Sequence, residues 1–306
     1  MTSDLQKIRA DINRRKIINS AFALAGLVVI AGAIILLLGL VLQMAIEGSE
    51  RLTPEFFTSF PSRRAGRAGI YSAWVGTSLV MLVTAFAAVP LGVAAGIYLE
   101  EYAKKGWLAD LIEINVTNLA GVPSIVYGLL ALGLFIYTFR LGQSILTAGL
   151  TLALLILPVV IVTTREALRA IPNNLREAAY ALGASKWQAI WDHILPYSFG
   201  SILTGIIIGL SRAIGQTAPI ITIGALAFIA YLPESPVQSE FPFVSFDWLS
   251  SGFTVLPIQM FNWVSRPQKA FEINAAAAGT VLVCMTLGMN AIAIYLRYQL
   301  RKGIKW

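Results

Sequence analysis

Six apolar stretches of the chain are each long enough to cross a lipid bilayer, and they constrain the fold more than any other feature. A membrane-spanning helix needs about 20 mostly apolar residues, because its backbone groups find no water to bond in the bilayer core. Only 13% of the 306 residues are charged, about half the share of a soluble domain. The sequence therefore predicts an all-α membrane protein with six transmembrane helices, at residues 17–46, 72–99, 117–139, 143–164, 197–230 and 271–297.

The first stretch and the basic residues predict how the chain lies in the membrane. The first stretch exceeds the roughly 7–15 apolar residues of a cleavable signal, so we expect it to remain as an anchor. If the N-terminus is cytoplasmic, fifteen of the 23 Lys and Arg residues fall in cytoplasmic segments and seven in outside segments. This bias predicts that both termini are cytoplasmic. Arg63, Arg64 and Arg67 of the first outside loop oppose the trend, and they suit an acidic binding protein, phosphate or anionic headgroups.

Small residues and prolines inside the stretches are typical of a transporter or channel rather than an inert anchor. The pairs Gly92–Gly96 and Gly205–Gly209 predict faces where two helices approach closely. Prolines are expected to interrupt four of the six helices, and the carbonyl groups that they free must line a cavity or be covered by neighbours. These prolines are Pro90, Pro123, Pro158 and Pro219.

One charge, Arg212, lies well inside an apolar stretch. A mid-membrane arginine costs about 3 kcal/mol on insertion scales, so it needs a carboxylate, a wet cavity or an anion beside it. At about 100° per residue, a helix would place Gly205, Gly209, Arg212 and Gln216 on one stripe, with Ser201 at its edge. A guanidinium matches tetrahedral oxyanions, which favours an anionic substrate. The alternatives are that Arg212 reaches toward the membrane surface or pairs with a carboxylate of a second subunit.

The polar segment between the fourth and fifth stretches predicts two short cytoplasmic helices. Asn174 is placed to cap the first helix together with Glu177, and Gly183 suits the left-handed position after its end. Ser185 is placed to cap the second helix, and Pro196 to end it and begin the next span.

Several other residues have structural interpretations that compete with functional ones. Cys284, the single cysteine, is expected to be a small buried residue, and the single histidine, His193, is also interpreted as structural. Small and polar residues on one predicted face of the third stretch suit either a translocation path or helix packing; they are Thr117, Gly121, Ser124 and Gly128. Aromatic residues of the outside loop 231–270 suit either a belt at the headgroup level or a docking surface for a solute-binding protein; they are Phe241, Phe243, Phe246, Trp248, Phe253, Phe261 and Trp263.

Catalytic chemistry is not expected. The sequence contains no Cys/His cluster for a metal, no nucleophile–base constellation and no G-x-x-x-x-G-K-[ST] phosphate-binding loop. We therefore expect no metal, no cofactor and no enzymatic activity, and if ATP drives this protein, another chain must hydrolyse it.

The cytoplasmic segment resembles the EAA loop of ABC-importer permeases. The match rests on Glu177-Ala178-Ala179, Gly183 and Ile194-Leu195-Pro196 at the family's spacing. In that family the loop docks on the nucleotide-binding subunit, so the resemblance implies a coupling role for Glu177, Ala178, Ala179, Gly183 and Pro196. The alternative is an amphipathic helix pair that lies at the membrane surface without a partner.

Further segments are similar to the permeases of phosphate-specific ABC importers: Pro90–Tyr102, Leu119–Leu130, Arg165–Arg169 and Ser211–Pro219. The single N-terminal anchor, the moderate first outside loop and the basic tail from Arg297 to Lys305 favour the A-type subunit over its C-type partner. Together with the position of Arg212 inside an apolar stretch, the resemblance implies a substrate path through Arg212, Gln216, Ser211, Thr217 and Ser124. Gln216 departs from the family, which commonly has Glu there, so the acid is either lost or supplied by the partner subunit.

The combined prediction is the permease subunit of an ATP-driven phosphate importer, with a type I ABC-importer (MetI-like) core and one additional N-terminal helix. Its expected parts are an anchor region at 1–70, a permease core at 71–297 with the coupling loop 165–196, and a basic tail at 298–306. Expected partners are a homologous C-type permease, two ATP-binding subunits, a periplasmic or extracellular phosphate-binding protein and the lipid bilayer of the bacterial cytoplasmic membrane, with no nucleic acid.

Two alternatives stay open. One is a permease for another oxyanion such as molybdate or sulfate. The other is an anion channel or an ion-coupled symporter, against which the EAA-like loop and the lack of Asp and Glu in the apolar runs of the third, fourth and fifth stretches both speak.

Overall fold

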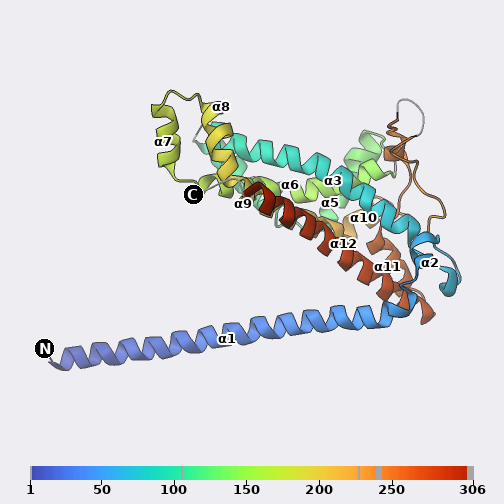
Figure 1. Cartoon of the computed structure of the whole chain (residues 1–306), viewed down its shortest axis with the longest axis horizontal. Helices are drawn as coiled ribbons and strands as arrows, with labels where there is room; N and C mark the ends of the chain where they lie inside the picture. Colours follow the sequence, from blue (N-terminus) through green and yellow to red (C-terminus); the bar gives the residue numbers. More distant parts are fainter. Residues whose placement is uncertain (1, 105, 227, 239–242, 302–306) are drawn as a thin grey trace.

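The protein is an all-helical membrane protein, as its sequence predicts. The computed structural model describes residues 2–104, 106–226, 228–238 and 243–301, and all its long elements are helices (Figure 1). Phe241, residues 302–306 of the predicted basic tail, and Lys105, one of the fifteen basic residues predicted to be cytoplasmic, lie outside the described residues. Five helices are long and apolar enough to cross a membrane, and a bent helix pair makes a sixth candidate. The long helices are α1 (Thr2–Gly48), α3 (Tyr71–Ile97), α6 (Ile145–Arg169), α9 (Leu195–Ile214) and α12 (Ala270–Arg301).

The third predicted span, at 117–139, is not one continuous helix. It is broken between α4 (Trp107–Leu119) and α5 (Ser124–Ala131), which continues as a π-helix over Leu132–Thr138; the two parts meet at a bend of 104°. Pro123 lacks an N–H and restricts the residue before it, which explains the break. The Tyr127 hydroxyl donates a hydrogen bond of 2.7 Å to the carbonyl of Leu119 and so satisfies a group that the break frees. Thr117 lies before the bend and therefore does not share a helical face with Ser124 and Gly128.

The fifth span also ends earlier than predicted. Helix α9 stops at Ile214, Gly215 follows it, and a separate short helix α10 begins at Ala218 and ends at Thr222. Glycine and the proline in the first turn of α10, Pro219, both disfavour a continuous helix here. The predicted stripe of Gly205, Gly209, Arg212 and Gln216 is therefore wrong at its last residue, because Gln216 lies beyond the helix that carries Arg212.

The other predicted proline interruptions are wrong. Pro90 and Pro158 lie inside the continuous helices α3 and α6, since neighbouring helices and local adjustments accommodate the lost hydrogen bond within a bundle. Pro196 does not separate two helices either, because one helical span runs from Lys186 to Ile214. This span passes from α8 (Lys186–Gln188) through a π-helical turn over Ala189–Ile194 into α9.

Helix α6 is the centre of the bundle, and glycines bring its neighbours close. In the most apolar 18-residue segment of α6, 67% of the residues are buried, the largest share among the five candidate spans. A Cβ atom on Gly92 or Gly96 of α3 would lie 2.7 Å from side-chain atoms of α6. Gly205 of α9 lies against Thr163 of α6, and Gly209 faces Ile156 and Val160. The predicted small-residue faces are thus confirmed as sites of close helix approach.

The two ends of the bundle carry the connecting segments (Figure 1). The α7 (Asn173–Ala181) and α8 segment lies at the same end as the start of α1 and the end of α12, whereas α2 (Pro54–Thr58) and α11 (Leu256–Val264) lie at the opposite end. At that opposite end the Arg51 guanidinium joins α12 to the first loop, with hydrogen bonds to Asn274 and to the carbonyls of Gly66 and Ala68.

The aromatic residues of the loop 231–270 divide into two groups. Trp248, Phe253 and Trp263 are buried in the core, so they do not form a belt, whereas Phe243, Phe246 and Phe261 are exposed. The buried group fixes the loop on the bundle.

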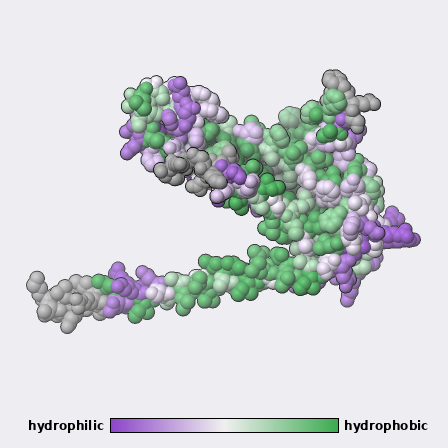
Figure 2. All heavy atoms as spheres, in the orientation of Figure 1, coloured by the Kyte–Doolittle hydropathy of each residue, from purple (hydrophilic) through white to green (hydrophobic). Residues whose placement is uncertain are grey.

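Two other elements are exposed. None of the residues in the most apolar 18-residue segment of α1, in the part from Ile12 onward, is buried. Helix α1 meets α12 near the C-terminal end of α1, where Gly48 approaches Ala277 and Met44 approaches Gly279. Figure 2 shows the middle of α1 as a hydrophobic rod that stands apart from the bundle. Cys284 of α12 is exposed rather than buried, which corrects the sequence prediction; a bilayer is as apolar as a core, so an apolar run does not tell the two apart.

A glycine substitution tests the central packing. In Gly96→Ala the new Cβ would lie 2.7 Å from Thr164 and 3.1 Å from the Ile161 carbonyl. We therefore expect the free energy of unfolding to fall by about 1–3 kcal/mol, and the purified protein to unfold at a lower temperature. Gly288→Ala is the matched control, because nothing lies within 4 Å of its Cβ position. Equal unfolding midpoints for the two variants would contradict the packing described.

Candidate translocation path and coupling surface

The two broken segments of the bundle pack against each other. Gly128 of α5 lies against α10, where its Cβ would meet Thr222 and would lie 2.7 Å from the Cα of Pro219. Ser124 is the first residue of α5 and Thr217 directly precedes α10, and both are partly buried. Two helix breaks, between α4 and α5 and between α9 and α10, therefore flank one packed unit. Discontinuous helices of this kind form substrate sites in several transporter folds.

Arg212 lies in the last turn of α9, and its side chain is exposed. Within the described residues, no hydrogen bond or ion pair to Arg212 is present. The last carbonyl groups of a helix carry a partial negative charge that offsets part of the cost of the cation. The guanidinium group is close enough to the Tyr127 hydroxyl of α5 for the two to interact electrostatically. The charge is therefore near the α4–α5 break and is open to a ligand.

The surface of α9 divides into two packed sides with an exposed strip between them. Ser201, Ile208 and Arg212 are exposed, and at 100° per residue they fall within about 40° of one another. On one side of this strip, Gly205 and Gly209 face α6. On the other side, Ser211 and Thr204 bond to α12. The glycines of the predicted stripe therefore serve helix packing, and Arg212 shares the open strip with Ser201.

Ser211 faces the neighbouring helix rather than the open strip. Its Oγ lies 2.6 Å from Oδ1 of Asn290 on α12 and 2.7 Å from the Ile207 carbonyl. The same two helices are joined again where Arg297 donates to the Thr204 hydroxyl at 2.7 Å. Ser211 therefore lies next to Arg212 in sequence but acts between helices.

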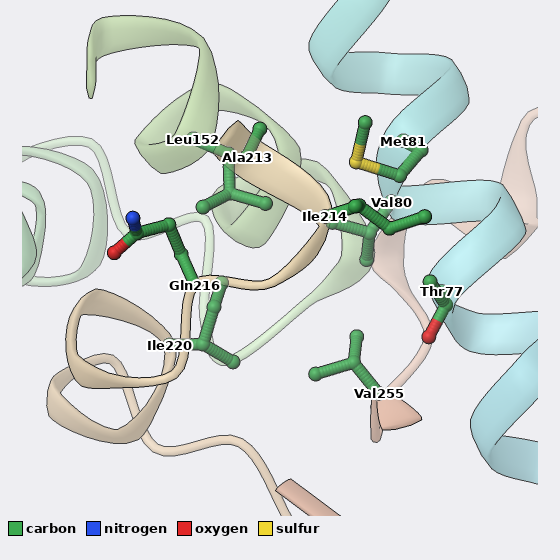
Figure 3. Close-up of a pocket in the computed structure, with 9 residues that line it drawn as sticks. All are labelled: Thr77, Val80, Met81, Leu152, Ala213, Ile214, Gln216, Ile220 and Val255. Carbon is green, nitrogen blue, oxygen red and sulfur yellow. The ribbon is translucent and has the colours of Figure 1, made fainter. Parts of the chain in front are cut away.

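Gln216 lines a small apolar cavity, but its amide group points away from it. Figure 3 shows the Gln216 amide turned away from the other labelled side chains, which come from α3, α6, the end of α9, α10 and the segment before α11. The cavity volume is about 10 Å³, enough for about one water molecule and too small for an oxyanion such as phosphate. This cavity is therefore not the substrate site.

The predicted coupling loop forms one short helix, α7, and the start of the span that continues through α8 into α9, with the expected caps at two of three positions. Gly183 has φ +86°. Its backbone N–H donates to the carbonyl of Tyr180, and the N–H of Ala184 donates to the carbonyl of Ala179, so a Schellman motif ends α7. Ser185 caps α8 in a full capping box with Gln188. The Asn174 cap is wrong: α7 begins at Asn173 after Pro172, without a side-chain cap, because a proline just before the first turn already sets the chain direction.

The residues predicted to couple to an ATPase present a mixed surface. Glu177 and Ala178 are exposed, whereas Ala179 is buried, so the two alanines do not share one open face. Exposed apolar side chains follow them in the same segment: Leu182 is 89% exposed, and the rings of Trp187 and Trp191 stack with their centroids 5.4 Å apart. Such a surface suits a protein partner better than water.

A cluster of ion pairs that was not predicted from the sequence joins this loop to the bundle. Arg176 of α7 binds Glu101 at 2.7 Å and donates to the carbonyls of Leu168 and Ile171. Arg165 and Arg169 of α6 each pair with Glu100 and Glu113, the latter from α4. All of these charges flank spans at the end predicted to be cytoplasmic, so their opposite signs were the available signal.

Comparisons with known proteins place the chain in a family. Residues 88–306 match the family model described as the inner membrane component of binding-protein-dependent transport systems. A phosphate transport system permease protein PstA of Mycobacterium leprae is 34% identical over 238 residues, or 78% of this chain and 73% of that protein. PstA of Yersinia pestis is 34% identical over 264 residues, or 84% and 82%. The probable ABC transporter permease protein YqgI of Bacillus subtilis is 30% identical and covers 94% of this chain and 97% of that protein.

The fold agrees with this family. A solved structure of the MetNI methionine ABC transporter is similar with a TM-score of 0.57 and 15% identity, over 76% of this chain and 95% of that one. The likeness shows a MetI-like permease fold. The chain therefore belongs to the family of inner-membrane components of binding-protein-dependent transport systems, and it is a multi-pass membrane protein whose relatives are named transport permeases.

Removal of the Arg176 side chain tests the cluster that holds α7. Arg176→Gln leaves Glu101, which is 7% exposed, without its partner, and the loss of one member of a buried pair costs about 3 kcal/mol. We therefore expect amide hydrogen exchange in α7 to accelerate about a hundredfold. Arg169→Gln is the control, since its side chain is 57% exposed and exposed pairs contribute little. Similar exchange rates in both variants would contradict a holding role for Arg176.

Proposed function

We propose that this chain is the A-type permease subunit of an ATP-driven phosphate importer. The observation that carries the proposal is Arg212: an exposed guanidinium at the end of a broken membrane helix, without an acidic partner in the described part of the chain. A guanidinium in a membrane needs a counter-charge, and its planar fork matches a tetrahedral oxyanion. The phosphate transport permeases among the relatives support phosphate as that anion.

The substrate path proposed from the sequence is refined by the geometry. Arg212 is the anion contact, and the exposed strip that it shares with Ser201 leads along α9 toward α7 and α8. Ser124 lies at the start of α5, where helix N–H groups favour negative charge, and Tyr127, one turn later, interacts with Arg212. Thr217 and Gln216 lie in the adjacent α9–α10 break and complete the proposed path. Ser211 contributes indirectly, through α12.

The surfaces of the chain support the proposed partners. Of the two ATP-binding subunits, one would dock on this chain and the other on its partner permease. The docking surface of this chain would be formed by Glu177, Ala178, Gly183 and the exposed apolar side chains of the same segment. A C-type permease would cover the open strip of α9 and complete the path. A phosphate-binding protein would deliver the anion at the opposite end, near α2 and α11. Both termini would then be cytoplasmic, in a bacterial inner membrane.

The mechanism proposed is alternating access. Closure of the ATPases would push α7, and the ion pairs of Arg176, Arg165 and Arg169 would transmit this motion to α3, α4 and α6. Because α9 is packed on α6, the exposed strip would turn from one side of the membrane toward the other. Phosphate would leave Arg212 when the inner side opens.

Substitution of Arg212 tests the function. In the transporter reconstituted in vesicles with its partners, we expect Arg212→Gln to lower phosphate uptake at saturating phosphate about ten- to a hundredfold, the effect of one lost charge-assisted hydrogen bond. Arg212→Lys keeps the charge but not the fork, so its uptake should be intermediate. ATP hydrolysis should continue in both.

The control is Arg140→Gln, which removes an exposed arginine from the turn before α6. Normal phosphate uptake by Arg212→Gln would show that Arg212 reaches toward the surface or serves packing. Uptake of sulfate or molybdate but not phosphate by the unmodified transporter would favour the other oxyanions.

A further inference from the structure

Two polar bridges join α9 to α12, and they are spaced by seven residues on both helices. The inner bridge pairs Ser211 with Asn290 at 2.6 Å, and the other pairs Thr204 with Arg297 at 2.7 Å. Seven residues are two helical turns, so the bridges lie on one seam of an antiparallel pair, about 10 Å apart. Polar residues at such a seam fix which faces of two helices meet.

The Ser211–Asn290 bridge can satisfy both partners. A serine hydroxyl carries one proton, and Oγ of Ser211 lies within 2.7 Å of both the Ile207 carbonyl and the Asn290 amide. With the amide nitrogen turned toward Oγ, the serine donates to Ile207 and accepts from Asn290; the two orientations of an amide have the same shape. The bridge is therefore a complete polar contact inside the bundle.

The position of this bridge links it to the exposed arginine. Ser211 directly precedes Arg212, and α9 ends at Ile214. In the described part of the chain, Asn290 is the one side chain of another helix that hydrogen-bonds to this last turn. On the opposite side, Gly205 and Gly209 hold α9 against α6. The direction in which the Arg212 side chain leaves the helix thus depends on how α9 is held on two sides, by α6 and by α12. Near the end of α9, the contact with α12 is made by Asn290.

We propose that Asn290 is a positioning residue for Arg212: through Ser211 it fixes the rotation of the last turn of α9 and thereby holds the guanidinium on the open strip. The inference rests on the proposed function, because the group that is positioned is the proposed anion contact. Asn290 itself touches no substrate. The Thr204–Arg297 bridge joins the same helices two turns away and does not adjoin Arg212, so it provides a matched control.

The test compares variants of the two bridges in the complete transporter in vesicles, with inorganic phosphate as the probe. Asn290→Leu keeps the volume and removes the bond, and we expect the maximal uptake rate to fall about three- to tenfold, the range of an interhelical hydrogen bond in a membrane. The phosphate concentration at half-maximal uptake and the ATPase rate should stay unchanged. Thr204→Val should alter uptake less than about twofold. Ser211→Thr, which keeps the hydroxyl, should retain nearly normal uptake.

The double variant Ser211→Ala with Asn290→Leu separates one bond from two independent effects. Its uptake should be no lower than that of either single variant, because both remove the same contact. If Asn290→Leu does not assemble, Ser211→Ala alone carries the comparison with Thr204→Val. Normal uptake in Asn290→Leu, or an equal loss in Thr204→Val, would overturn the positioning role.

A second measurement does not depend on phosphate. In a Cys284→Ser background, a spin label at Arg212→Cys should become more mobile when Asn290→Leu is added and should not change when Thr204→Val is added. An unchanged spectrum with Asn290→Leu would overturn the proposal. If the unmodified transporter moved no phosphate, the proposed function would fail, while the spectrum would still decide whether Asn290 orients position 212.

Discussion

The close approach of α3 and α9 to α6 is the contact on which the rest of the bundle depends. Glycines on the outer helices allow it: Gly92 and Gly96 lie against α6 on one side, and Gly205 and Gly209 on the other. Water does not drive helices together inside a bilayer, so close van der Waals packing of small residues must do so. This packing also sets the rotation of α9, because a helix that presents its glycines to α6 and Ser211 to α12 must present Arg212 between them.

One arginine is therefore exposed by the packing of its own helix. Arg212 lies near two helix breaks, and its charge is within electrostatic range of Tyr127, which bonds across the first break. At the other end of α6, Arg165 and Arg169 bind Glu100, which follows α3, and Glu113 of α4, while Arg176 pairs α7 with Glu101. The same central helix thus connects the proposed coupling surface with the proposed anion contact.

The sequence predicts the parts of this structure that depend on local chemistry. The helical class, the close approach at the glycine pairs, the Gly183 turn and the Ser185 cap are confirmed, because each follows from residue type and spacing. Interruptions were predicted at four prolines, and breaks are present beside Pro123 and Pro219. Pro90 and Pro158 lie in continuous helices, because the local sequence does not show which prolines the neighbouring helices accommodate. Ser211 and Cys284 show the same limit: whether a membrane residue faces a neighbouring helix or the outside depends on the rotation of that helix in the bundle. The pairing of Glu100 and Glu113 with α6 likewise depends on how the helix ends meet in space.

The central claim is that the strip of α9 with Ser201, Ile208 and Arg212 borders an aqueous anion path. The most direct test is thiol accessibility in the assembled transporter, since Cys284→Ser alone leaves a chain without cysteine. Ser201→Cys and Ile208→Cys should react with a small charged, membrane-impermeant thiol reagent, at rates that change with ATP and fall when phosphate is present. Ile35→Cys on the exposed face of α1 should not react. Labelling of Ser201→Cys and Ile208→Cys only by a lipid-soluble reagent, with no effect of phosphate or ATP, would show that the strip faces lipid and would contradict the account.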